Sequence, residues 1–291
     1  MEDHHLLQPI VSTITTTTTA IDDDDIAVST SAIIYRMVMV IFIAIVSIWA
    51  NYEASKGFEI IIINDAGNTP AGHRFAVFFI SDGKAIRIVQ NTSEFAEKVL
   101  YPNASQPKKQ VHHVTLRLAG RNLTDVVVVN MSKSHEFVLH ISPSMMEEIN
   151  LEKAMVSAVQ RGMARVWLWD GEISTAPRSI IDGMVEYVGI SAGFGGSPDS
   201  GGLKLPEFDG NSCWDDRDSV NVARFLNYCE RVRPGFIGRL NQAMRDGWDV
   251  RTVDDALGLP AQQLCYYYYS SIVRISNVMG PTSTSGRIQS I

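Results

Sequence analysis

The sequence has little of what marks several common classes of protein. Its 291 residues include three cysteines, Cys213, Cys229 and Cys265, and their spacing fits no zinc-ribbon or redox motif. One disulfide with a free thiol and three reduced thiols both remain open at this stage. The formal net charge is −7, so the chain lacks the basic footprint of a nucleic-acid-binding protein, and we expect no nucleic-acid partner.

Histidine is absent after His140, and this absence argues against a serine hydrolase. Gly189-Ile-Ser-Ala-Gly193 matches G-x-S-x-G, but that motif needs a strand-to-helix turn and a later histidine. It follows a helical pattern here, so we expect Gly193 to end a helix. The glycine-rich stretch 193–202 lacks the lysine of a phosphate-binding loop and is interpreted as a surface loop. The remaining histidines of this region lack the helical spacing of metal ligands. We therefore expect ordinary strand residues at His112, His113, His135 and His140.

A composition of 45% hydrophobic and 20% charged residues is typical of a globular protein, and the length suits one or two domains. Residues 1–31 are rich in threonine and aspartate and are predicted to be a disordered acidic tail. Residues 276–291 are rich in serine, glycine and threonine and are predicted to be a flexible tail. The globular domain is expected between them, over residues 58–275.

Residues 32–50 form the longest apolar run, in which Arg36 is the single charge. A helix of this length nearly matches a hydrocarbon core of about 30 Å, so we predict a single transmembrane anchor. A signal peptide cleaved near Ala50 and a buried core helix are the alternatives. A short N-terminal tail before a large domain favours an extracytoplasmic domain, or a secreted one if the segment is cleaved.

Four N-glycosylation motifs all lie after the apolar run. About two are expected by chance from the asparagine content, so coincidence is the alternative to a glycoprotein outside the cytoplasm. The four motifs begin at Asn91, Asn103, Asn122 and Asn130.

The apolar periodicity of the domain changes at Pro143. Before it, patterns of buried strands occupy residues 58–64, 111–118, 125–130 and 136–141. After it, apolar residues recur at helical spacing from Met155 to Trp169 and again from Val222 to Cys229, and Pro234 and Pro260 suit first helical turns. We therefore predict an α+β domain, with a small mixed sheet followed by a helical C-terminal half.

The stretch 161–193 resembles the plant basic secretory protein family. Val166-Trp-Leu-Trp-Asp-Gly171 matches the family's tryptophan segment, and Asp182-Gly-Met-Val-Glu-Tyr-Val188 matches a later segment that begins E-G. Further similar segments lie at 67–75, 213–216, 223–229, 235–237, 240–241, 244–248 and 257–259, so that the resemblance spans about 215 residues. It implies a zincin-like peptidase fold, secretion and a role in plant defence.

The same resemblance places a zinc-binding H-E-x-x-H motif on residues of this chain that cannot perform its chemistry. The two histidines of the motif correspond to Arg161 and Arg165, its glutamate to Gly162, and a distal glutamate ligand to Asp182. A guanidinium offers no lone pair to zinc, and glycine offers no base. We therefore expect no catalytic residues, no metal and no other cofactor.

The altered positions suggest a structural replacement for the metal. Arg161 and Arg165 are four residues apart, as are Asp182 and Glu186, so each pair shares one helical face. If the two helices face each other, the four side chains form an ion-pair cluster; the alternative is that both arginines point to solvent.

The resulting hypothesis is a non-catalytic, membrane-anchored protein that binds a peptide or glycan in the remaining cleft. The alternatives are an active peptidase with an atypical site and a structural paralogue without a ligand. The sequence indicates no oligomeric state.

Overall fold

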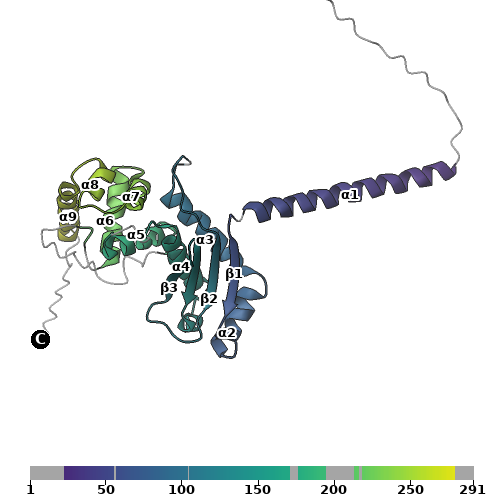
Figure 1. Ribbon diagram of the computed structural model, residues 1–291, viewed down its shortest axis with the longest axis horizontal. Helices are drawn as coiled ribbons and strands as arrows, with labels where there is room; N and C mark the ends of the chain where they lie inside the picture. The colour runs from purple at the N-terminus through teal and green to yellow at the C-terminus, as the bar shows by residue number, and fades with distance from the viewer. Residues whose placement is uncertain are drawn as a thin grey trace, which may run out of the picture. The chain divides into compact units, whose positions relative to one another are not determined.

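The computed structural model describes residues 23–55, 57–103, 105–170, 176–194, 213–215 and 218–278. Within these ranges, side chains are described from 32 to 48 and from 57 to 273. The chain divides into two compact units, Met1–Lys56 and Gly57–Ile291. The second unit holds the sheet and the packed helices, and therefore the site described below (Figure 1).

The first unit contains α1 (Asp23–Ser55), one continuous helix. It covers the apolar run 32–50 and extends beyond it at both ends, while residues 1–22 of the expected tail lie outside the described residues. Its large apolar side chains between Ile33 and Ile48 are exposed. Over the described ranges, no helix combines the length and the apolar content needed to cross a membrane.

The second unit is built on a four-stranded mixed sheet, as the sequence predicted. Its strand order is β1-β2-β4-β3, and its members are β1 (Glu59–Asn64), β2 (His113–Leu118), β3 (Val127–Lys133) and β4 (Glu136–Ile141). β1, β2 and β4 run parallel, and β3 is antiparallel to β4. Alternate residues of β2 and β4 are buried, which accounts for the period of two in the sequence.

A long helix that the sequence analysis did not anticipate lies between the first two strands. α3 (Lys84–Leu100) connects β1 to β2, because parallel neighbours need a crossover rather than a hairpin. The simple order of strands first and helices second is therefore wrong at this point. The buried residues of α3 nevertheless recur at helical spacing. They are Ala85, Ile88, Val89, Thr92, Ser93, Ala96 and Leu100.

A shorter helix begins soon after β1 ends. The side chain of Thr69 accepts a hydrogen bond from the Gly72 amide and so caps α2 (Pro70–Phe75). The chain continues through a π-helical turn, η1 (Ala76–Ile80), before α3 begins.

The helix that carries the altered motif packs beside α3. α4 (Leu151–Trp167) follows the 3-10 turn η2 (Pro143–Glu147) and is capped by the side chain of Asn150. Met155, Val159, Gly162 and Val166 are buried, in agreement with the predicted helical face. The helix ends at Leu168, whose backbone is extended, so Trp169 lies outside it.

The C-terminal half is helical, as predicted. Its helices are α5 (Arg178–Ser191), α6 (Ser219–Val232), α7 (Phe236–Arg245), α8 (Thr252–Leu257) and α9 (Ala261–Val278).

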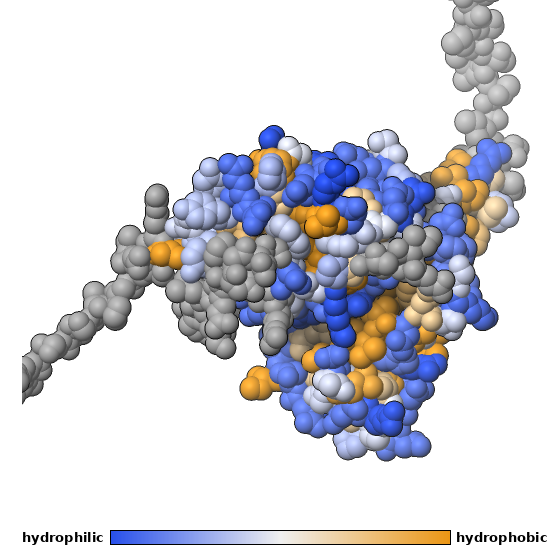
Figure 2. All heavy atoms as spheres, turned by 60° about the vertical axis from the view of Figure 1, so that its left-hand side comes forward, coloured by the Kyte–Doolittle hydropathy of each residue, from blue (hydrophilic) through white to orange (hydrophobic). Residues whose placement is uncertain are grey.

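The disulfide Cys213–Cys265 links α9 to the segment that precedes α6. Cys229 is a buried free thiol, so the cysteine alternatives resolve to one disulfide and one thiol. Pro234 and Pro260 lie just before α7 and α9 rather than within their first turns. On the face shown in Figure 2, apolar residues are interspersed among polar and charged ones.

Candidate functional site

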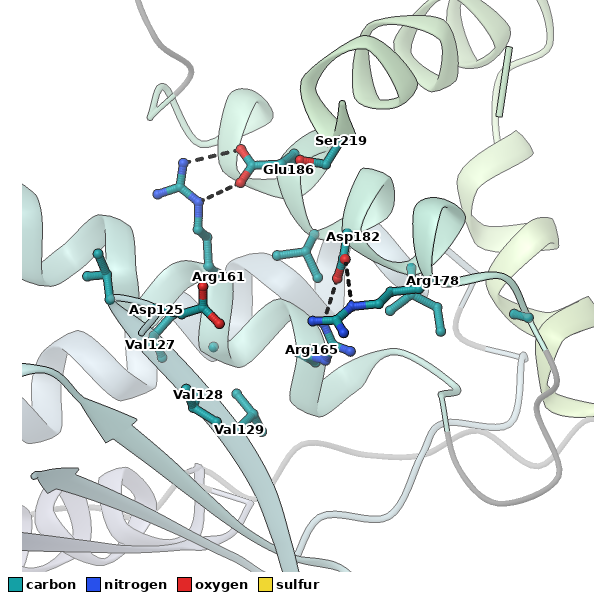
Figure 3. A pocket seen from close by; sticks show the side chains of 15 residues that line it. Asp125, Val127, Val128, Val129, Arg161, Arg165, Arg178, Asp182, Glu186 and Ser219 are labelled. Atoms are coloured by element: carbon teal, nitrogen blue, oxygen red, sulfur yellow. Dashed lines mark hydrogen bonds and ion pairs between the residues drawn. The ribbon is translucent and has the colours of Figure 1, made fainter. Parts of the chain in front are cut away.

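A cleft with a volume of about 880 Å³ lies between α4, α5 and the edge strand β3. Arg161, Gly162 and Arg165 contribute from α4, and Asp182 and Glu186 from α5 (Figure 3). The remaining lining residues are Asp125, Val126, Val127, Val128, Val129, Ala176, Arg178, Ile181, Val185 and Ser219. The cleft therefore contains all four positions that the resemblance assigns to the zinc site.

Arg161 and Glu186 form a two-point ion pair across the cleft (Figure 3). Nε of Arg161 donates to Oε1 of Glu186 at 2.8 Å, and Nη2 donates to Oε2 at 3.2 Å. Nη1 donates to Oγ of Ser157, one turn earlier on α4, at 2.7 Å. Both charged side chains are mostly buried, at 34% and 20% exposure, so this pairing is less screened by water than a surface ion pair.

Arg165 and Asp182 form the second link between α4 and α5. Nη1 of Arg165 donates to Oδ1 of Asp182 at 2.7 Å. The other oxygen of Asp182 accepts from Nε of Arg178, at the start of α5, at 3.3 Å. Asp182 therefore lies between two guanidinium groups, one half-buried and one exposed.

The charge network extends through Asp170 to Lys109, a residue that the sequence analysis missed. Asp170 lies 3.6 Å from Nε of Arg165 and accepts from Nζ of Lys109 at 3.2 Å. Lys109 also donates to the backbone oxygen of Leu168, and its ammonium lies 5.0 Å from the centre of the Phe137 ring. Burial lowers the pKa of Lys109, and the charge of Asp170 acts against that effect. No local motif around Lys109 signals this contact.

Buried hydrogen bonds hold the C-terminal end of α4 in place. Nε1 of Trp167 donates to Oγ of Ser93 at 2.9 Å, and the hydroxyl of Tyr101 donates to the oxygen of Trp167 at 2.8 Å. The amide of Trp169 donates to Oδ1 of Asn241 at 3.1 Å. Burial raises the pKa of Tyr101 to about 12, which keeps its hydroxyl protonated as a donor. The tryptophan segment thus anchors the cleft helix to α3 and α7.

Gly162 of α4 packs closely against a side chain of β4. A Cβ atom at this position would be 2.6 Å from Cδ2 and 3.0 Å from Cγ of Leu139, a fully buried residue. Contacts this short require the buried Leu139 side chain, or one of the two elements, to move. A glutamate in the place of Gly162 therefore does not fit the present packing.

The residues of the cleft do not fit a zinc ion. Arg161 and Arg165 have no lone pair for a metal, and both oxygens of Asp182 are bonded to guanidinium groups. In the part of the chain that the structure describes, no group of three or more histidine, cysteine, aspartate or glutamate side chains is placed to hold a metal ion.

The histidines and the serine motif lie apart from this cleft. His113 and His140 are on β2 and β4, and the rings of His112 and His135 are 5.0 Å apart. Ser191 lies in the last turn of α5 rather than at a strand-to-helix elbow. Gly193, with φ at +83°, closes that helix, whereas the glycine-rich stretch from residue 195 lies outside the described residues.

The comparisons with known proteins address the family directly. No curated protein and no solved structure matches the chain. A family model described as a peptidase of plants and bacteria, BSP, matches residues 55–268, which include the sheet, the cleft and most of the C-terminal helices. The chain therefore belongs to the BSP peptidase family of plants and bacteria.

Proposed function

We propose that this family member binds a peptide in its cleft without hydrolysing it. The observation that carries the proposal is the double ion pair of Arg161 with Glu186 and of Arg165 with Asp182, at the positions assigned to the zinc site. These arginines occupy the space of a metal and neutralise the carboxylates that would hold it. The family resemblance adds a role in plant defence to this proposal.

The walls of the cleft support a peptide as the ligand. β3 lies at the edge of the sheet, with β4 as its neighbour among the described strands, and residues 127–129 of this strand line the cleft. An edge strand offers backbone donors and acceptors to an extended peptide, which adds as a further strand. The neighbouring side chains of Ile181 and Val185 offer apolar contacts for alternate side chains of such a peptide.

The test measures binding and hydrolysis on the same protein. A fluorescent random-hexapeptide library is incubated with the full chain, and retained and cleaved peptides are identified by mass spectrometry. We expect retention without cleavage. Val126 is exposed and lines the cleft, so Val126→Trp should reduce retention. Ile149→Trp, at an exposed apolar position outside the cleft lining, is the matched control and should leave retention unchanged.

Two results contradict this proposal. The first is cleavage by the unmodified chain that Val126→Trp removes, because it would establish the alternative, an active peptidase with an atypical site. The second is retention that Val126→Trp does not reduce, because the peptide would then bind elsewhere on the molecule.

Membrane anchoring and N-glycosylation complete the proposal. The apolar sequence 32–50 supports a single-pass anchor with the domain outside the cytoplasm, and the disulfide Cys213–Cys265 suits an oxidising compartment. The asparagines of all four glycosylation motifs are exposed, as the modification requires.

Expression in plant cells tests both features. We expect the chain to stay in the membrane pellet after alkaline carbonate extraction and to lose mass on treatment with a peptide-N-glycosidase. Release into the supernatant would favour the cleaved, secreted form, and an unchanged mass would contradict the extracytoplasmic placement.

A further inference from the structure

We infer that the end of the cleft formed by Arg165 and Arg178 binds the C-terminal carboxylate of a peptide ligand. This inference rests on the proposed peptide-binding function and adds to it the chemical group that the cleft recognises. It follows from the distribution of charge in the cleft, the donors of the two arginines and the apolar character of the surrounding wall.

Charge is balanced across the cleft lining but unevenly distributed. Among the described residues of the lining, three are arginines and three carry carboxylates. Figure 3 shows Asp125 on the side of Arg161, whose own partner is Glu186. On the other side, Arg165 and Arg178 share Asp182, the one carboxylate that the described part of the lining places beside them.

The described residues of the neighbouring network leave this excess of positive charge in place. Asp170, the second carboxylate near Arg165, is already paired with the buried Lys109. Three cations, Lys109, Arg165 and Arg178, therefore alternate with two anions, Asp170 and Asp182. An added carboxylate beside Arg165 and Arg178 would bring the net charge of these groups to zero.

Both guanidinium groups have donors beyond those that bind Asp182. Arg165 uses Nη1 and Arg178 uses Nε for this carboxylate, and each guanidinium carries five N–H groups in a planar fork. The side chain of Arg178 is 82% exposed, so it can turn toward an incoming ligand without disturbing the core. Planar, forked donors match the two oxygens of a carboxylate.

The surroundings favour a peptide over an anionic sugar. Valines of β3 line the cleft, and so do Ile181 and Val185 of α5. These aliphatic side chains suit the last apolar residues of a peptide. None of the described lining residues is aromatic, so the cleft offers no flat ring for a sugar face to stack on.

The test compares two forms of one probe, a fluorescein-labelled tetrapeptide of valine and leucine, with a free C-terminal carboxylate or with a C-terminal amide. Fluorescence polarisation with the full chain gives both dissociation constants. We expect the acid to bind about ten-fold more tightly than the amide, as charge-assisted hydrogen bonds imply. Arg178→Gln should reduce that ratio to about one. The matched control is Arg87→Gln, because Arg87 is also exposed and bonded to an aspartate but lies outside the cleft, and it should keep the ratio.

Four other results would overturn the inference, and each has a different meaning. Equal binding of acid and amide would leave peptide binding intact and remove the carboxylate contact. A preference that survives Arg178→Gln would place the contact elsewhere. Binding of digalacturonate with no binding of either peptide would replace the peptide with an anionic glycan, and binding of no probe would contradict the proposed function as well.

Discussion

Arg161 and Glu186 are 25 residues apart in sequence and face each other across the cleft through two hydrogen bonds of 2.8 and 3.2 Å. Together with the contact between Arg165 and Asp182, this pair joins α4 to α5 at the positions where the family resemblance places a metal. A metal ion holds elements together through its ligands, and here opposite charges supply the corresponding attraction.

The ion pair should contribute measurably to stability. A double-mutant cycle with Arg161→Ala and Glu186→Ala should give a coupling energy of about 1–2 kcal/mol, because both groups are mostly buried and bonded at two points. Urea unfolding of the four proteins measures it.

A matched exposed pair provides the control for that cycle. Arg87 and Asp82 are 52% and 57% exposed, so water screens this pair and its coupling energy should be clearly smaller than that of the cleft pair. Equal coupling energies for the two pairs would show that the cleft pair is no more than an ordinary surface contact.

Gly162 should tolerate no larger residue. In Gly162→Ala, the added methyl group meets Leu139, so we expect a loss of about 1–3 kcal/mol from overpacking. Gly189 is also buried within a helix, but a Cβ there meets no atom within 4 Å. Gly189→Ala should therefore stabilise the protein by about 0.5–1 kcal/mol. Thermal unfolding compares the two variants, and shifts in the same direction would contradict the packing described for Gly162.

The sequence predicted the parts of this structure that depend on local periodicity. Alternate apolar residues located β2 and β4, and the spacing of four placed Arg161 with Arg165 and Asp182 with Glu186. α3 carries an equally clear helical period, so the same criterion applied to residues 84–100 identifies it as a helix. The juxtaposition of α4 and α5 came from family resemblance, because periodicity does not specify which helices are neighbours.

Lys109 shows what sequence patterns could not supply. It belongs to an irregular segment between α3 and β2, and it reaches Asp170 across 61 residues of sequence. Only the tertiary packing of that segment against the end of α4 makes the contact. The cysteine pairing was likewise undetermined, since three thiols allow several arrangements.

The disulfide should make a large contribution to stability. Cys213 and Cys265 enclose a separation of 52 residues, for which the chain-entropy model gives about 4 kcal/mol. The double variant Cys213→Ala with Cys265→Ala should lose about that amount in urea unfolding. An unchanged unfolding midpoint would contradict the pairing.

Cys229 should be unreactive in the folded protein. It is fully buried, and desolvation raises the pKa of its thiol, so little of the reactive thiolate forms near neutral pH. Iodoacetamide should modify no cysteine under native conditions and one cysteine in urea without reductant, as measured by mass spectrometry. Rapid native labelling would place the thiol at an accessible position.

Zinc content tests the central claim most directly. The purified full chain is dialysed against micromolar zinc, exchanged into metal-free buffer and analysed by plasma mass spectrometry beside an H-E-x-x-H metallopeptidase. We predict less than about 0.1 zinc ion per chain, because arginines stand at the positions that the family resemblance assigns to two zinc ligands and bind Asp182 and Glu186. About one zinc ion per chain, lost in Asp182→Asn, would contradict the replacement of the metal by ion pairs.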